Sequence, residues 1–347
     1  MHRIKTTTLG VLLLSAIILI PACRQPEKKA PVRNTVKKPK VEEQPLAVPD
    51  FNADSAFYYV EKQLSFGFRI PGTRAHAQTA RWIEARLRSY GAHVKVQKGR
   101  GRMYTDKVIE LHNIIASLNP ESHKRILLMA HWDSRRFADH DPDPKKRKDP
   151  VPGANDGASG VAVLMEMIRT IQSQPLQHIG IDVVLVDAED QGTPDNMGIV
   201  HGPNSAESWG LGAQYWSRNP HRSPGLFRYG ILLDMVGASG ATFPREQYSL
   251  EYAPQVVEKV WNLASKLGFG NYFIMEKTAG GITDDHYFVN TIVHIPMIDI
   301  IHYDVLKNSF YPYWHTTADD LKQIDKSTLN ATGRTLLELL YREDIAL

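Results

Sequence analysis

The chain has 347 residues, of which 42% are hydrophobic and 23% are charged. This is the composition of a globular protein, and it excludes a chain that is disordered throughout. The formal net charge is +3, but residues 1–43 hold nine Lys or Arg against three Glu, so the rest carries about −3 (3 minus 6). Because the folded part has no basic surplus, a nucleic-acid partner is not expected.

Residues 1–22 have the pattern of an export signal. The segment MHRIKTTT is positively charged, and the apolar run LGVLLLSAIILIPA after it is short for a membrane span. The run ends at Cys23, the only cysteine in the chain, with a small residue directly before it. This resembles the cleavage site of bacterial lipoproteins, which implies a lipid attached to Cys23. An ordinary signal peptide or an N-terminal anchor with a chance cysteine is the alternative.

The chain is therefore expected to have three parts. A lipoprotein signal peptide spans 1–22, a disordered tether spans 23–50, and a single folded domain spans 51–347. The tether is rich in Lys and Pro and has no apolar periodicity, so it cannot bury enough surface to fold. We expect the protein to be exported to the periplasm of a Gram-negative bacterium and held at a membrane by its lipid.

The domain alternates helical and strand-like segments. Helical patterns are present at 52–66, 75–90, 158–173, 254–267 and 326–341. Runs that are apolar at nearly every position indicate strands, and they read HVKVQ, HNIIASL, RILLMAH, IDVVLVD, YGILLDMV and IPMIDII. This alternation predicts an α/β domain with a mixed, largely parallel central sheet and helices on both faces. In such folds the working residues lie beyond the carboxyl ends of the strands.

Six segments carry acids or imidazoles at strand ends or in the adjacent loops. In chain order these residues are His131 and Asp133, Asp156, then Asp187, Glu189 and Asp190, then Asp234, then Asp284, Asp285 and His286, and finally His315. Each alone has an ordinary structural explanation, such as a helix cap or a paired buried acid. Together, so many carboxylates at one sheet edge would repel each other without a cation. Their oxygen and nitrogen donors suit zinc.

The motifs AHWDS, PGANDGASG, DAED, LLDMVGA, TDDHYFV and YWHTTAD, in this order, resemble those of the zinc aminopeptidase and glutaminyl cyclase superfamily. They are most similar to the bacterial glutaminyl-peptide cyclotransferases, from about residue 51 to the C-terminus. The resemblance implies a zinc aminopeptidase-like fold and a zinc ion held by Asp156, Asp190 and His315. It also implies that Glu189 is the general acid and base.

The resemblance implies further roles. Asp234 and Asp285 correspond to the acids that share a hydrogen-bond network with the catalytic glutamate of the cyclases, and Trp314 corresponds to an aromatic wall that binds the substrate. His131 corresponds to a ligand of the second metal in the aminopeptidases, and Asp133 to the residue that orients a neighbour. The chain departs from the animal cyclases at Asp190, where they have glutamate.

Two activities fit these residues. A glutaminyl cyclase closes the N-terminal Gln of a peptide or protein to pyroglutamate, and one zinc per chain is enough as its Lewis acid. An aminopeptidase uses two zinc ions to activate water and hydrolyses the first peptide bond. Three features favour the cyclase: the sequence WHT at His315, the second acid in TDDHYF, and the loop at 134–160. Because His131 and Asp234 are present, the two-zinc aminopeptidase remains the alternative.

A purely structural metal site is the non-enzymatic alternative. Such a site is normally closed by four protein ligands and has no spare base. Acids beyond the three ligands, Glu189 above all, therefore favour an enzyme. The segment 191–220, rich in Gly, Pro and Asn, is predicted to be an irregular loop over the pocket, with Trp209 or Trp216 lining it.

Overall fold

The computed structural model describes residues 46–194 and 205–346, which belong to one compact unit that begins at Leu46. The predicted signal peptide, Cys23 and the predicted tether up to residue 45 lie outside the described residues. Within the described part, no helix combines the length and the apolar character needed to cross a bilayer.

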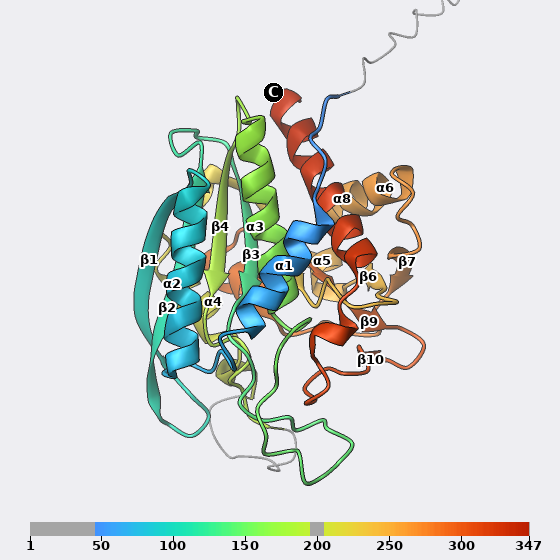
Figure 1. The fold of residues 1–347 in the computed structure, drawn as a ribbon. Helices are drawn as coiled ribbons and strands as arrows, with labels where there is room; N and C mark the ends of the chain where they lie inside the picture. The colour runs from blue at the N-terminus through green and yellow to red at the C-terminus, as the bar shows by residue number, and fades with distance from the viewer. Residues whose placement is uncertain (1–45, 195–204, 347) are drawn as a thin grey trace, which may run out of the picture. The chain divides into compact units, whose positions relative to one another are not determined.

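A six-stranded mixed sheet forms the centre of this unit, in the order β1-β2-β4-β3-β5-β8 (Figure 1). Its strands are β1 (His93–Arg102), β2 (Val108–Leu118), β3 (Arg125–His131), β4 (Gly180–Val186), β5 (Phe227–Asp234) and β8 (Met297–Ile301). The pairs β1/β2 and β2/β4 are antiparallel, and the other neighbours are parallel. The predicted mixed, largely parallel sheet is therefore confirmed.

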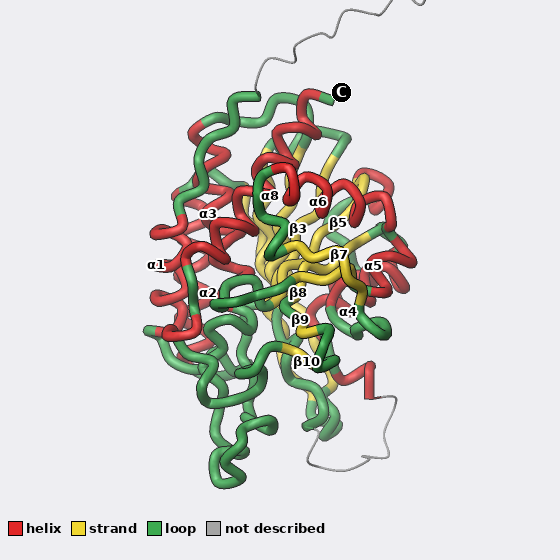
Figure 2. The backbone as a smooth tube through the Cα atoms, turned by 90° about the vertical axis from the view of Figure 1, so that its right-hand side faces the viewer, coloured by secondary structure: helices red, strands yellow, loops and turns green. Residues whose placement is uncertain are grey.

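Helices cover both faces of the sheet (Figures 1 and 2). One face carries α1 (Ala53–Leu64), α2 (Arg74–Ser89), α3 (Ala158–Ser173) and α8 (Lys326–Ile345), and the other carries α4 (Leu211–Arg218), α7 (Asp285–Phe288) and a π-helical turn (Val289–Val293). Beside β8 lie α5 (Gln247–Tyr252) and α6 (Pro254–Lys266), with a small sheet of β6 (Phe243–Arg245) and β7 (Phe273–Lys277). A hairpin of β9 (Tyr303–Asp304) and β10 (Ser309–Phe310) and a 3-10 turn (Leu321–Gln323) precede α8.

The strands are apolar at every position because both of their faces are covered. In β3, Leu128 and its alternate neighbours join the large cluster that contains α1, α3 and α8 residues. Leu127 and Met129 point the other way, into a cluster that contains Trp216 of α4. Successive side chains of a strand point to opposite faces of the sheet, so a strand buried on both faces loses the usual apolar-polar alternation.

The predicted helices and strands are all present, with shifted ends, but the prediction of an irregular segment at 191–220 is wrong in part. A 3-10 turn (Ser205–Ser208) and α4 lie within it. Two glycines hide the helical pattern. One of them, Gly212, is required because a side chain there would come within 2.3 Å of the carbonyl oxygen of Asp187. The helix is held by tertiary packing, since Trp216 is fully buried against the sheet.

Candidate active site

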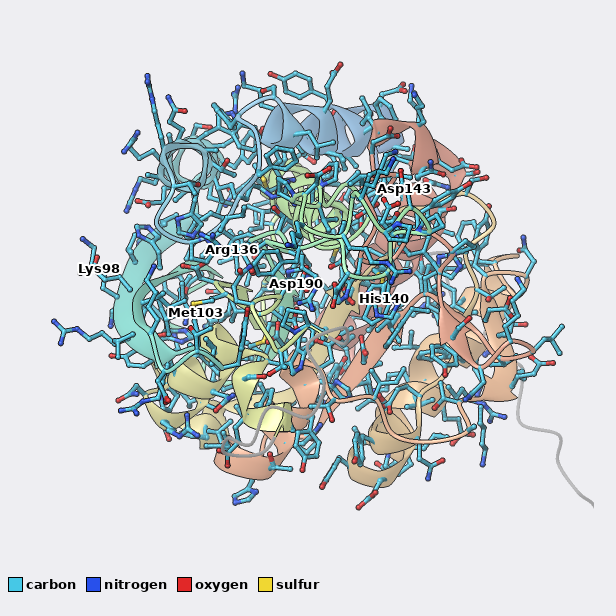
Figure 3. All side chains as sticks on the ribbon, turned by 90° about the horizontal axis from the view of Figure 1, so that it is seen from below. Lys98, Met103, Arg136, His140, Asp143 and Asp190 are labelled. Atoms are coloured by element: carbon cyan, nitrogen blue, oxygen red, sulfur yellow. The ribbon has the colours of Figure 1, made fainter. Side chains whose placement is uncertain are left out.

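The predicted site residues meet at the carboxyl edge of the parallel strands, the face seen in Figure 3 with Asp190 near its centre. Strand β3 ends at His131 and β5 at Asp234, while Glu189 and Asp190 follow the end of β4. The backbone bends sharply just after β4 and just after β5. Ala188 follows β4 and Met235 follows β5, and both have a positive φ, 55° and 52°. Non-glycine residues rarely adopt this backbone, and such positions concentrate at functional sites.

The bend at Ala188 separates Asp187 from the two acids after it. The Asp187 carboxylate lies away from the site and accepts hydrogen bonds from His76 Nε2 and from the backbone N–H of His112, both at 2.8 Å. Asp187 is therefore a structural acid that fixes the end of β4.

Asp133 holds the turn that presents Glu189 and Asp190. Its Oδ1 accepts from the Glu189 N–H at 3.0 Å, and its Oδ2 accepts from the Asp190 N–H at 3.3 Å and from the Gln191 side chain at 3.0 Å. It is fully buried and also lies 3.4 Å from His131 Nδ1. Asp133 therefore fixes the backbone that carries the two acids.

Asp156, Asp190 and His315 form a group that could hold a metal ion. One ligand atom from each lies within 4.8 Å of the others, and His315 Nε2 is 3.0 Å from Asp190 Oδ1 and 3.8 Å from Asp156 Oδ2. The Oδ2 atoms of both acids are buried without a hydrogen-bond partner among the described residues. Burial and the charge of Arg135 lower the pKa of His315 well below its usual value. The imidazole is thus neutral, as a zinc ligand must be, and the group fits zinc.

Arg135 and Asp139, which no sequence pattern singled out, lie next to this group. The buried guanidinium of Arg135 pairs with both oxygens of Asp139, at 2.6 and 2.7 Å, and donates to the Asp190 carbonyl at 3.1 Å. It also lies 4.6 Å from the centre of the Trp209 ring. Asp139 Oδ1 is 3.5 Å from His315 Nδ1, on the ring edge opposite the ligand nitrogen. Such outer contacts orient metal ligands.

Asp319 holds the third possible ligand, Asp156, in place through hydrogen bonds to the backbone. Its carboxylate accepts from the backbone N–H groups of Asn155, at 2.9 Å, and Asp156, at 3.1 Å. The hydroxyl of Tyr311 also donates to it. Its position in the motif YWHTTAD, four residues after His315, is the one sequence signal that could have identified it.

A second possible ligand group shares Asp156. His131 Nε2 lies 3.0 Å from Asp156 Oδ1 and 3.2 Å from Asp234 Oδ1, and all three residues are buried. The five residues that a two-metal aminopeptidase would need are therefore close together. Burial is the largest cause that raises the Asp234 pKa, to about 7.

Glu189 is the acid whose environment suits proton transfer. It lines the same cavity as Asp156 and Asp234. Burial raises the pKa of its carboxyl well above the usual range, and the charges of Asp284 and Asp190 add to this, against an opposing effect of His131. A carboxyl group with a raised pKa can both accept and return a proton near neutral pH.

In the segment ITDDHYF, the sequence predicts that Asp285 is the acid that interacts with Glu189, but the structure places Asp284 in the cavity instead. Asp284 lines the cavity, whereas Asp285 does not. Asp284 is the N-cap of α7 and accepts from the Asp285 N–H at 2.5 Å, which leaves its other oxygen buried without a partner among the described residues. Asp285 is the first residue of α7 and lies next to Gly210 at the start of α4. Because both residues are aspartates, the N-cap preference of aspartate does not distinguish them in the sequence.

Asp299 is another buried acid that the sequence did not indicate. It lies on β8 beside Asp284 and His286, and one ligand atom from each of the three is within 4.8 Å of the others. Burial and the charge of Asp284 raise its pKa well above the usual range. Two neighbouring acids in a dry site hold a proton between them.

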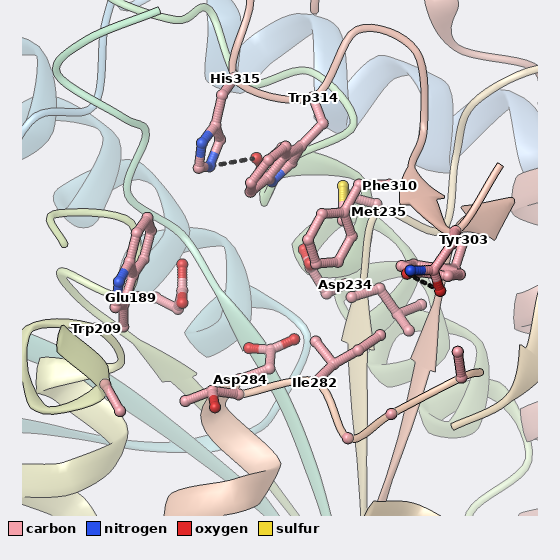
Figure 4. Close-up of a pocket in the computed structure, with 18 residues that line it drawn as sticks. Glu189, Trp209, Asp234, Met235, Ile282, Asp284, Tyr303, Phe310, Trp314 and His315 are labelled. Carbon is pink, nitrogen blue, oxygen red and sulfur yellow. Dashed lines mark hydrogen bonds and ion pairs between the residues drawn. The ribbon is translucent and has the colours of Figure 1, made fainter. Parts of the chain in front are cut away.

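Aromatic rings enclose the site, in a cavity of about 650 Å³ (Figure 4). The Trp314 ring stacks on His315 with centroids 3.7 Å apart, and the Trp209 ring is parallel to His315 at 5.8 Å. Both tryptophans line the cavity, as predicted for Trp314 and considered for Trp209. Trp216, the other candidate, is a core residue instead.

Residues 113–340 match the family model described as Peptidase family M28. The chain belongs to the M28 peptidase family. This M28 chain is 46% identical to a glutaminyl cyclase of Bacteroides thetaiotaomicron solved with N-acetylhistamine bound, over 85% of this chain and 99% of that one, with a TM-score of 0.81. It is 48% identical to a Zn-dependent exopeptidase of Parabacteroides distasonis, with the same coverage and TM-score.

Among curated relatives, a glutaminyl-peptide cyclotransferase-like protein of Mus musculus is 25% identical over 78% of this M28 chain and 71% of its own length. The Parabacteroides relative is a Zn-dependent enzyme, and the donor set at Asp156, Asp190 and His315 is one that suits zinc. The prediction of zinc is thus supported at the level of the family.

Proposed function

We propose that this M28 protein is a glutaminyl cyclase, which converts the N-terminal Gln of peptides and proteins to pyroglutamate and ammonia. The observation that carries the proposal is that Glu189, an acid with a raised pKa, lines one cavity with Trp209, Trp314 and two members of the possible ligand group, Asp156 and His315. The high identity to a bacterial glutaminyl cyclase over nearly that protein's whole length supports it.

Proton transfer is the task of Glu189 in this reaction. The substrate's α-amine attacks its own γ-amide carbon, a C–N bond forms, and the bond to the amide nitrogen breaks. Glu189 takes a proton from the attacking amine and returns it to the leaving nitrogen, so ammonia departs and no water is consumed. One zinc ion, held by Asp156, Asp190 and His315, would supply a Lewis acid for the γ-carbonyl oxygen.

Orientation is the task of the aromatic rings. An extended glutamine must fold its side chain back onto its amine, and holding reacting atoms in that geometry removes a large part of the barrier. In the cavity, Trp209 lies beside Glu189, and Trp314 lies beside His315 (Figure 4). Trp209 is itself held by the guanidinium of Arg135.

An aminopeptidase with two zinc ions is the second candidate, because His131, Asp156 and Asp234 form another buried ligand group. Its chemistry differs in using water as the nucleophile and in releasing a free amino acid. The two activities therefore give different products from different substrates.

The deciding experiment compares Gln-initiated and Leu-initiated peptide amides, each with and without a zinc chelator. We expect ammonia and a cyclised peptide from the Gln substrates only, loss of activity with the chelator, and recovery with added zinc. Zinc content measured by mass spectrometry should be one ion per chain. Release of free leucine, together with two ions per chain, would establish the aminopeptidase instead.

We also propose that the protein is a periplasmic lipoprotein anchored through Cys23 in a Gram-negative bacterium. The charged segment, the apolar run and the position of the single cysteine support this. The variant Cys23→Ser should move the protein from the membrane fraction to the soluble fraction. An unchanged distribution would contradict lipid anchoring.

A further inference from the structure

A second cavity lies outside the catalytic cavity, between α2 and the hairpin of β1 and β2. It encloses about 890 Å³ and shares no lining residue with the catalytic cavity. It is formed by 71–81 at the start of α2, by 98–100 of β1 and by 107–112 at the start of β2, together with Tyr215. Four exposed cations line this cavity, which is called the basic groove below: Arg81, Lys98, Arg100 and Lys107.

The sequence of β1 explains why cations gather there. Val94 packs against the cluster that contains Ile83 of α2, so its side chain faces the side of the sheet that α2 covers. Side chains two residues apart on a strand point to the same face, so Lys98 and Arg100 face that side too. Arg81 reaches the groove from α2, and the cations therefore converge from opposite walls.

These cations lack the acids that would neutralise them. Glu110 is the one acid among the described residues that line the groove, so four cations leave a surplus of three (4 minus 1). In the described part of the chain, none of the four forms an ion pair. Other acids close by are engaged elsewhere, since Glu84 contacts His112 Nε2 at 2.8 Å and Asp106 pairs with Arg102 at 3.5 Å. The groove is thus positive in a domain whose total charge is negative.

Protection of a free sheet edge accounts for only part of this charge. β1 is an edge strand, and charged side chains on such strands prevent pairing with another chain. That explanation covers Lys98 and Arg100, but not Arg81, which lies on a helix and lines the same cavity. A negatively charged ligand accounts for all of these cations.

The basic groove extends towards the active site. A smaller cavity of about 210 Å³ shares Lys107 with it and is also lined by Gln191, which follows Asp190 in the chain. In the view of Figure 3, Arg136 of this smaller cavity lies between Lys98 and Asp190. A polypeptide held at the active site by its first residue therefore has the groove within reach of its later residues.

We infer that the basic groove binds an acidic segment of the polypeptide substrate, several residues after the N-terminal glutamine. This inference rests on the proposed cyclase function and adds a substrate class to it. Lys98 and Arg100 are about 6.6–6.8 Å apart along β1, and alternate side chains of an extended peptide have the same spacing. A membrane surface is flat and does not enter a groove, so a peptide is the better fit.

The test compares Gln-initiated peptides that differ only in their tails, using the full-length mature protein. Each peptide has Gln-Ala, a Gly-Ser spacer of variable length, and a tail in which every second residue is either Glu or Gln. Because several exposed ion pairs act together, the Glu tail should lower KM about tenfold at ~10 mM salt. This advantage should vanish near 1 M salt, where the Debye length is about 3 Å. The kcat should stay unchanged, since the tail takes no part in the reaction.

The outcomes separate this inference from the proposed function. Equal KM values for both tails at every spacer length would overturn the inference and leave the cyclase function intact. Failure to cyclise either peptide would overturn the proposed function, and the inference with it.

Charge reversal locates the effect. The double variant Lys98→Glu/Arg100→Glu, and separately Arg81→Glu on the opposite wall, should weaken or remove the Glu-tail advantage and leave turnover of Gln-Ala-amide unchanged. The matched control is Lys266→Glu/Lys277→Glu, two exposed positions on α6 and β7 beside the opposite edge of the sheet, which should retain the advantage. An advantage that persists in both groove variants would overturn the assignment.

Anionic lipid is the other ligand class with the same charge. The soluble Cys23→Ser protein is sedimented with vesicles of phosphatidylglycerol and phosphatidylcholine, with and without the Lys98→Glu/Arg100→Glu change. We expect the two proteins to sediment equally. Vesicle binding that the double variant abolishes, together with equal KM values for both tails, would assign the groove to the membrane and overturn the inference.

Discussion

Glu189 and Asp190 are neighbours in the chain, yet they serve the site in different ways. The left-handed backbone at Ala188 ends β4, and Asp133 then holds the N–H groups of both acids. Asp190 lies against His315 within the ligand group, while Glu189 lines the cavity beside Asp234. A regular strand would have pointed the two side chains to opposite faces of the sheet.

The first prediction concerns Glu189. Glu189→Gln should lower kcat by about 10²–10⁴-fold, because the amide cannot accept and return the proton, and it should leave the zinc content unchanged. Rates and zinc content by mass spectrometry check both parts. Glu207→Gln, an exposed position on the 3-10 turn near the pocket, is the control and should behave like the unmodified protein. A near-normal kcat in Glu189→Gln would refute its role as the base.

The second prediction separates Asp284 from Asp285. The charge of Asp284 is a larger cause of the raised Glu189 pKa than that of Asp285. Asp284→Asn should therefore lower the Glu189 pKa and shift the acidic limb of the pH–rate profile to lower pH, with a reduced kcat. Asp285→Asn should shift the profile less, because the Asp285 charge is a smaller cause of the raised Glu189 pKa and its side chain does not line the cavity. The reverse ranking would restore Asp285 as the functional acid.

At the scale of elements, the neighbouring strands β3 and β4 are joined by a buried ion pair at the end away from the site. Arg125 Nε donates to Asp182 at 2.5 Å, and both side chains are fully buried. Burial raises the Asp182 pKa, but the nearby His221 and the hydrogen bonds from Arg125 outweigh it and lower the pKa to about 2. His221 Nε2 lies 3.5 Å from Asp182 Oδ1, whereas Arg125 Nε lies 2.5 Å from Asp182 Oδ2. We therefore attribute the lowered Asp182 pKa mainly to Arg125.

The third prediction follows from this pair. The folded pKa of about 2 is below the unfolded value of roughly 3.9. The pair therefore stabilises the fold above about pH 4, and this stability is lost as pH falls from 4 towards 2. Asp182→Asn leaves Arg125 unpaired and should cost about 3–5 kcal/mol at pH 7, with a smaller difference at pH 3. Urea unfolding at both pH values measures this.

The control for Asp182→Asn is Asp106→Asn. Asp106 pairs with Arg102 at 3.5 Å on the surface, where both side chains are exposed, so this substitution should change stability little. If Asp182→Asn were equally harmless at pH 7, the buried pair would not stabilise the junction of β3 and β4.

At the scale of the whole molecule, the fourth prediction is that zinc stabilises the fold. The ligands come from the turn before α3, the end of β4 and the segment before α8, and they come together only in the folded chain. At a free zinc concentration of 100 times Kd, binding adds about 2.7 kcal/mol. Chelation should lower Tm by roughly 5 °C or more. Asp190→Ala, which should not retain zinc, is the control whose Tm should not respond; a chelator-independent Tm in the unmodified protein would contradict the prediction.

The sequence by itself determined the α/β fold and most of the site. Continuous apolar runs specify strands buried on both faces, and the acids that end them reach the same sheet edge in any largely parallel arrangement. The resemblance of the motifs to a known family then selected Asp156, Asp190 and His315 as one ligand group before their distances were known. These inferences depend on local pattern, on the order of the strands and on that resemblance.

Only the tertiary structure decided which of two neighbouring residues faces the cavity. The choice between Asp284 and Asp285 depends on where α7 begins, and the choice between Trp209 and Trp216 depends on how α4 packs. The supporting position of Arg135 depends on contacts with residues from distant parts of the chain. The direction of a side chain is fixed by backbone angles and packing, so it becomes definite only when the elements are assembled.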